Sequence, residues 1–297
     1  MKKIFITLMF IVMAILSKKV NAAMSDTAVF IQGLEHENFW TQIHAAEYMI
    51  DCNSHDIHLQ RWQDNAEKCF DTTPVKRIGV WRVKALDARS SGKDKEFQQV
   101  IGKLKKVAFA VSSPDRIHAL ETLFKLKIVL HPEEAARLKS EIQDEKASSA
   151  FRIYGAGLLS LSDTSTGQKI LLEEFTAAAV SSSEKFLTVF IWKNSQFLSD
   201  TVLAVIQAAL DSNQYDQGMQ IAMLGIMLQH HRISSENLFL LTDKFQSDGS
   251  ELLRLAVKYA PEKTSEFIKQ CAASNDIELR MLAAWAEIKI ANIEAAK

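Results

Sequence analysis

The sequence is poor in the residues that make sharp turns. It contains 10 glycines and 4 prolines among 297 residues, about 5% in total, whereas average proteins contain about 12%. An all-β chain needs frequent turns, so a β-sandwich or β-barrel is disfavoured. Apolar residues make up 47%, and 35 basic side chains balance 36 acidic ones. This composition excludes a disordered or collagen-like chain and indicates a globular, helical protein with a sizeable core.

The sequence also lacks the common signatures of catalytic and cofactor sites. It has no Gly-x-Ser-x-Gly elbow, no Gly-rich phosphate loop, no His-Glu-x-x-His, no Cys-x-x-Cys and no Rossmann fingerprint. We therefore expect no cofactor and favour a non-catalytic role. An enzyme whose residues meet only in space is the alternative.

Residues 1–22 have the pattern of a signal peptide. Lys2 and Lys3 precede an apolar run over residues 4–16, which is shorter than the ~20 residues of a membrane-spanning helix. We expect cleavage after Ala22 and export to a periplasm or to the outside of the cell. An uncleaved segment is the only membrane contact that we consider. The mature chain, residues 23–297, has 31 basic and 36 acidic side chains, and this mildly acidic balance excludes a nucleic-acid partner.

The three cysteines allow one disulfide in an oxidising compartment. Cys52 and Cys69 are close enough in sequence to close a loop, although three unpaired thiols are the alternative. Cys271 lies in an apolar periodic segment, which indicates a small buried side chain.

Apolar residues recur with helical spacing, as in residues 39–49 and 117–126. Turn-forming residues separate the helices at 51–54, 112–115, 131–132, 160–163, 212–213 and 247–250. Two of these breaks predict helix starts. Ser113-Pro114 would place proline in a first turn, and Pro132 is followed by two acids that favour the positive end of a helix dipole.

One short pattern returns along the chain. Its copies are Gln42-Ile43-His44-Ala45-Ala46-Glu47, Arg77-Ile78-Gly79-Val80-Trp81-Arg82, Arg116-Ile117-His118-Ala119-Leu120-Glu121 and Arg152-Ile153-Tyr154-Gly155-Ala156-Gly157, with weaker copies that begin at Gln220 and Arg280. The third residues of the first five copies are separated by 35, 39, 36 and 68 residues, and the last interval is two units of 34. Such a period in a helical chain predicts stacked helix pairs, in which small residues let neighbouring helices approach.

Through these Arg/Gln-Ile-x-Ala-like stretches the chain resembles the HEAT-like α-solenoid family over about residues 35–292. The resemblance implies an all-α fold, an α-solenoid of stacked helical hairpins that fills the mature chain, residues 23–297. It also implies a concave surface formed by the inner helices. A compact helical bundle or an α/α toroid is the alternative.

Two copies of the pattern contain His-Ala-x-Glu, so His44 and Glu47, and likewise His118 and Glu121, share one helix face. These pairs are candidates for a metal or for acid–base chemistry, and equally for internal supports of the repeats. A second group of possible metal ligands comprises His36, His44, His55 and His58.

The neighbouring arginines and tryptophan complete the set of ligand-binding candidates. Aromatic and charged side chains on one face are typical of a peptide or carbohydrate groove, and the candidates here are Arg77, Trp81, Arg82 and Arg116. The favoured function is a binding scaffold for a protein or extended ligand on the concave face. The alternative is a metal-dependent or acid–base enzyme, or a binder, that acts on glycans or cell-envelope material through the His/Glu pairs.

Overall fold

A computed structural model describes residues 27–144, 146–234 and 249–296, and the expected signal peptide lies outside these residues. The described part is helical and contains no strand, which confirms the all-α prediction. Residues 27–34 are helical. The further elements are α2 (Phe39–Asp51), α3 (Ile57–Phe70), α4 (Lys76–Ser90), α5 (Asp94–Ala108), α6 (Arg116–Lys125), α7 (Pro132–Ile142), α8 (Ser149–Leu159), α9 (Thr164–Thr176), α10 (Ser182–Lys193), α11 (Asp200–Ser212), α12 (Gln217–Gln229), α14 (Gly249–Tyr259), the 3-10 helix η2 (Pro261–Lys263), α15 (Ser265–Ala272) and α16 (Ile277–Ala295).

Of the two helix starts predicted at prolines, one is confirmed. Helix α7 begins at Pro132, and the Glu134 carboxylate accepts a 3.0 Å hydrogen bond from the backbone N–H of His131, which closes a capping box. The prediction at Pro114 is wrong, because α6 begins two residues later, at Arg116. The Ser113 hydroxyl donates to the Asp115 carboxylate at 2.6 Å and does not cap the helix, and the same carboxylate pairs with Arg77 of α4.

The chain divides into two compact units. Unit 1 comprises residues 1–65 and 261–297, and unit 2 comprises residues 66–260. Among the residues that the structure describes, none of the helices combines the length and apolar composition needed to span a bilayer.

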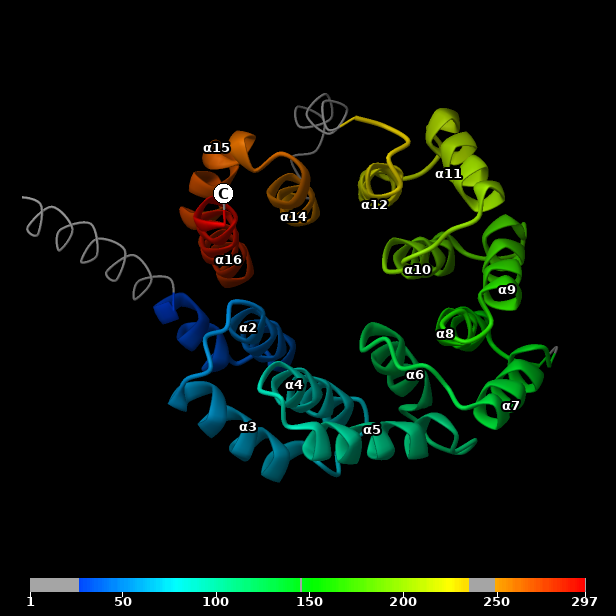
Figure 1. The fold of residues 1–297 in the computed structure, drawn as a ribbon, viewed down its shortest axis with the longest axis horizontal. Coiled ribbons are helices and arrows are strands. Elements are labelled where there is room, and N and C mark those ends of the chain that lie inside the picture. The colour runs from blue at the N-terminus through cyan, green and yellow to red at the C-terminus, as the bar shows by residue number, and fades with distance from the viewer. Residues whose placement is uncertain (1–26, 145, 235–248, 297) are drawn as a thin grey trace, which may run out of the picture. The chain divides into compact units, whose positions relative to one another are not determined.

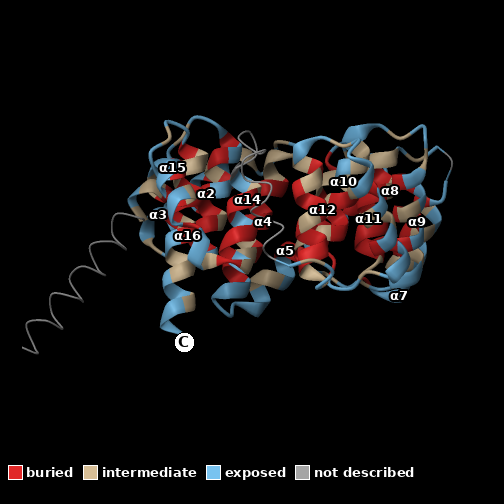
Figure 2. Cartoon of the chain, turned by 90° about the horizontal axis from the view of Figure 1, so that it is seen from above, coloured by how far each residue is buried: buried red, intermediate tan, exposed pale blue. Residues whose placement is uncertain are grey.

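Unit 2 is built from two rows of helices (Figure 1). The inner row consists of α4, α6, α8, α10, α12 and α14, each in contact with the next. The outer row consists of α5, α7, α9 and α11, which pack on one side of the inner row. Figure 2 shows buried residues concentrated on α8, α10 and α12 and exposed residues on α7 and α9. We call the side of the inner row that is turned away from the outer row the open face.

Helix α2 of unit 1 and three helices of the inner row end in the same way. A residue with positive φ follows each of α2, α4, α6 and α12, and these residues are Asn53, Gly92, Lys127 and His231. In each case the next backbone N–H donates to a carbonyl five residues earlier, at 2.8 to 3.0 Å, as in the bonds Ser54 to Met49, Lys93 to Ala88, Ile128 to Leu123 and Arg232 to Met227. This is the Schellman arrangement, which satisfies carbonyls left unpaired at a helix end. The same helix ending thus occurs four times, each time after a helix that contains a copy of the sequence pattern.

Small residues allow the inner helices to approach their neighbours, as the pattern predicts. A Cβ added to Gly155 would lie 2.5 Å from Ile142 of α7, and one added to Gly157 would lie 2.9 Å from Ile191 of α10. These distances are shorter than any normal carbon–carbon contact, so only glycine fits without a shift of the neighbouring side chain.

Unit 1 joins the two ends of the described chain, because α16 packs against α2. The indole N–H of Trp285 donates to the Asp51 carboxylate at 2.7 Å, and the Lys289 ammonium donates to the Asp51 carbonyl at 2.9 Å. Tyr48 also lies against the ring of Trp285, with centroids 6.2 Å apart. In an open solenoid each repeat contacts only its neighbours. The contact between α2 and α16 is therefore one that stacking of neighbouring repeats does not explain.

Candidate functional site

A polar stripe runs along one side of α6 in unit 2. His118, Glu121 and Lys125 are spaced three and four residues apart, so they share one side of the helix. Leu120 and Leu123, which are fully buried, occupy the opposite side. His118 Nδ1 lies 3.6 Å from Glu121 Oε2, and the Lys125 ammonium lies 2.7 Å from Glu121 Oε1. The sequence-predicted pair of His118 and Glu121 therefore forms.

The Glu121 carboxylate is held in its charged form. Burial opposes ionisation of Glu121, but the interactions with His118 and Lys125 and the charge of Arg82 outweigh burial and lower its pKa from 4.5 to about 2. The Glu121 side chain is 16% exposed, whereas that of His118 is 43% exposed. The charged carboxylate of Glu121 is therefore mostly buried, whereas the imidazole of His118 is open to solvent.

Side chains from the neighbouring inner helices complete this cluster. Arg82 comes from α4 and Tyr154 from α8. Burial, and then the charge of Glu121, raises the pKa of the Tyr154 hydroxyl, so this side chain stays neutral. The Lys125 ammonium also lies 5.1 Å from the ring centroid of Phe190 on α10.

The repeat explains why these residues meet. His118 and Tyr154 are the third residues of their copies, and Arg82 and Glu121 are the sixth residues of theirs. Positions three and six share a helix face, and stacking of α4, α6 and α8 places equivalent faces side by side. We call Arg82, His118, Glu121, Lys125 and Tyr154 the Glu121 cluster.

The Glu121 cluster leaves only its more exposed side chains open to a ligand. The charges of Arg82 and Lys125 act on the Glu121 carboxylate and lower its pKa. Glu121 itself cannot donate a proton near neutral pH, because its pKa is about 2. The half-exposed imidazole of His118 and the ammonium of Lys125 are the groups available to a partner.

Arg77, another candidate, makes an ion pair inside unit 2. Its Nε and one terminal nitrogen donate to the two carboxylate oxygens of Asp115 at 2.6 and 3.0 Å. The Asp115 side chain is fully buried. Burial opposes its ionisation, but hydrogen bonds from Arg77 and Ser113 lower the pKa of Asp115 below its usual value. Arg77 thereby links α4 to the residue that precedes α6.

Arg116 and Trp81 are also held by protein groups. Arg116 Nε donates to the carbonyl of Ala108 at 2.7 Å, and its guanidinium pairs with Glu141 and covers the ring of Phe151. The Trp81 side chain is almost entirely buried, its indole N–H donates to Asp71 at 3.0 Å, and Arg77 and Lys103 lie over its ring. Both side chains are thus held in place by neighbouring protein groups.

The pair of His44 and Glu47 belongs to unit 1. His44 Nδ1 lies 3.1 Å from a carboxylate oxygen of Glu278 on α16, so this imidazole contacts the C-terminal helix. His36, from the second histidine group, accepts a hydrogen bond from the backbone of Asn38 at 3.1 Å. Within the described ranges, no three or more His, Cys, Asp or Glu side chains are arranged to hold a metal ion.

The expected disulfide between Cys52 and Cys69 is not present in the structure, in which all three cysteines are thiols. Cys271 is buried in α15, as its apolar surroundings predict. Burial raises the pKa of the Cys271 thiol and makes it a poor nucleophile.

The sequence candidates omitted two members of the Glu121 cluster, Lys125 and Tyr154. The spacing of Glu121 and Lys125, four residues apart on a helix, is a signal that could have found Lys125. Tyr154 occupies the same position in its copy of the pattern as His118 does, which is a second such signal.

Comparison with known proteins returned no relative. No protein-family model matches the chain, and neither a curated protein nor a solved structure matches it significantly.

Proposed function

We propose that the protein is an exported helical-repeat protein of HEAT-like architecture that binds a protein or another extended ligand along the open face of its inner row. The Glu121 cluster is the observation that carries this proposal. It combines a half-exposed His118 with the charged groups of Arg82, Glu121 and Lys125. We place it on the open face, because Leu120 and Leu123 on the opposite side of α6 are fully buried.

Two further features support the repeat architecture. The Schellman ends of α2, α4, α6 and α12 recur with the sequence pattern, and glycines of the inner row allow close helix packing. The proposal of export depends on residues 1–22 alone.

A site-specific crosslinking experiment tests the binding function. A photo-reactive amino acid replaces His118 on the open face, and in a second protein it replaces Lys106, an exposed residue of α5. We expect crosslinks to a discrete partner from position 118 and none from position 106. The variant Lys125→Glu, which reverses one charge of the cluster, should reduce the yield at position 118. Equal labelling from both positions, or no crosslink from position 118 in exported protein, would contradict the proposal.

The alternative function is a metal-dependent or acid–base site at His118 and Glu121. The approach of these side chains to 3.6 Å favours this alternative, in which the ionised Glu121 would be a metal ligand and His118 the acid–base group. Metal analysis of the exported protein and of His118→Ala distinguishes the two functions. Stoichiometric metal that is lost in the variant would support the metal site, whereas metal-free protein that still crosslinks at position 118 would support the binding function.

A further inference from the structure

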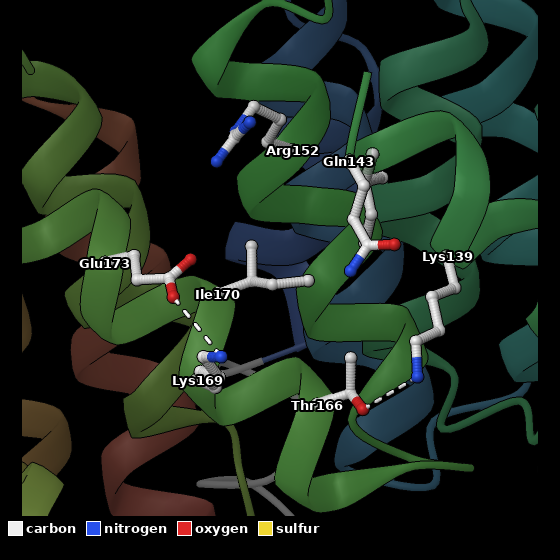
Figure 3. Close-up of a pocket in the computed structure, with 8 residues that line it drawn as sticks. Lys139, Gln143, Arg152, Thr166, Lys169, Ile170 and Glu173 are labelled. Atoms are coloured by element: carbon white, nitrogen blue, oxygen red, sulfur yellow. Dashed lines mark hydrogen bonds and ion pairs between the residues drawn. The ribbon is translucent and has the colours of Figure 1, made fainter. Parts of the chain in front are cut away.

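A cavity lies between α7, α8 and α9, apart from the Glu121 cluster. It has a volume of about 380 Å³. Its wall contains three cations, Lys139, Arg152 and Lys169, and one acid, Glu173. Figure 3 shows Arg152, Gln143 and Glu173 extending toward a common space beside Ile170.

Only one nitrogen of the Arg152 guanidinium donates a hydrogen bond to the described part of the protein. Its Nε donates to Glu174 Oε1 at 2.5 Å. Among the residues that the structure describes, its two terminal nitrogens have no hydrogen-bond partner, and neither does the buried second oxygen of Glu174. Arg77, at the same position of the repeat pattern, uses Nε and a terminal nitrogen on one carboxylate. Arg152 therefore keeps the edge formed by its terminal nitrogens available on the cavity side.

Each cation of the wall has an acid beside it, and only one of these acids, Glu173, lines the cavity. Glu174 neutralises Arg152, and the Lys139 ammonium lies 3.2 Å from the Thr166 hydroxyl and 3.5 Å from Asp163. Lys169 is largely exposed and lies 3.9 Å from Glu173, too far for a strong hydrogen bond. The excess of positive charge is confined to the lining itself, since Asp163 and Glu174 do not line the cavity.

The remaining wall residues indicate the shape of the ligand. A guanidinium edge matches the paired oxygens of a carboxylate or phosphate, and bidentate contacts of this kind are among the stronger charged hydrogen bonds. The side-chain amide of Gln143, which has no partner among the described residues, adds a neutral donor. Ile142 and Ile170 provide an apolar surface next to these polar groups.

We propose that this cavity binds a small ligand that carries an oxyanion, a carboxylate or a phosphate, beside an apolar portion. The terminal nitrogens of Arg152 and the amide of Gln143 hold the oxyanion, and Lys169 adds attraction at the entrance. The site does not depend on the function proposed for the open face.

Calorimetric titration of the full chain tests the cavity with two probes, inorganic phosphate and butyrate, at constant ionic strength. We expect saturable binding of at least one probe. Arg152→Lys keeps the charge but loses the planar edge, so it should weaken binding by about tenfold or more. Lys169→Gln removes an exposed charge and should weaken binding by about threefold. The control Lys106→Gln, an exposed lysine of α5 that does not line the cavity, should bind as the wild type does.

The two probes distinguish the sources of the oxyanion. Tighter binding of butyrate supports a carboxylate with an apolar tail, and tighter binding of phosphate supports a phosphate ester. The absence of saturable binding of both probes would overturn the proposal, and so would equal binding by wild type, Arg152→Lys and Lys169→Gln. If Arg152→Lys fails to fold because Glu174 loses its partner, Lys169→Gln decides, since the exposed side chain of Lys169 has little structural role.

Discussion

Replacement of Glu121 by glutamine should destabilise the protein in a pH-dependent way. The pKa of Glu121 falls from 4.5 to about 2 on folding. Each pKa unit corresponds to about 1.4 kcal/mol, so the ionised carboxylate stabilises the folded state by about 3 kcal/mol near neutral pH. Glutamine keeps a hydrogen-bonding oxygen but loses the charge that Lys125 and Arg82 compensate. We therefore expect Glu121→Gln to lower the free energy of unfolding by about 2–3 kcal/mol near pH 7.

The direction of the pH effect follows from the lowered pKa. A carboxylate with a depressed folded pKa contributes its full stabilisation above the unfolded value of 4.5, and this contribution is lost as the pH falls toward about 2. Wild type and Glu121→Gln should therefore converge in stability as the solution is acidified through this range.

Urea unfolding followed by helical circular dichroism measures the difference at neutral pH and at about pH 3. The control is Glu173→Gln, an exposed acid 3.9 Å from Lys169, which should change stability by less than about 0.5 kcal/mol. Equal unfolding free energies of wild type and Glu121→Gln at neutral pH would refute the reasoning. A difference that does not shrink on acidification would refute it as well.

Three further predictions concern packing, a buried ion pair and processing. Gly155→Ala places a methyl group 2.5 Å from Ile142 and should destabilise by about 1–3 kcal/mol in thermal unfolding, whereas Gly102→Ala, with no atom within 4 Å of the added carbon, should stabilise by up to about 1 kcal/mol. Arg77→Leu leaves the buried Asp115 unpaired and should cost about 3 kcal/mol in urea unfolding, and the second substitution Asp115→Asn should recover part of that loss. N-terminal sequencing of the exported protein should begin at Ala23, and an intact Met1 in that fraction would contradict cleavage after Ala22.

Much of the helical framework follows from local sequence signals. The break at residues 160–163 lies directly after α8, which ends at Leu159, and the break at 212–213 includes Ser212, the last residue of α11. The start at Pro132 has the same basis, because proline and the acids after it favour a helix N-terminus wherever that segment packs. The helix start predicted at Ser113-Pro114 was wrong. Asp115 forms a tertiary ion pair with Arg77, and the Ser113 hydroxyl donates to that carboxylate and so does not cap the helix.

The sequence pattern also identified part of the Glu121 cluster, but not how its members interact. The spacing of His118 and Glu121 is a property of one helix and was predictable. The low pKa of Glu121 depends on Arg82, which comes from another helix. Arg77 and Arg116 were candidates for ligand contacts, and no local signal could show that Asp115 and Glu141 are their partners.

By itself, the sequence determined that the described chain is helical, where several breaks between helices fall, and that small residues of the repeat pattern allow close packing. These properties depend on backbone preferences and on the spacing of apolar side chains, which act over a few residues. Tertiary structure alone decided that α16 packs against α2, that Arg152 keeps two nitrogens on the cavity side, and that Glu121 remains ionised. Each of these depends on charges or hydrogen bonds between segments far apart in the chain, and their energies are set by separation and burial that only the folded protein defines.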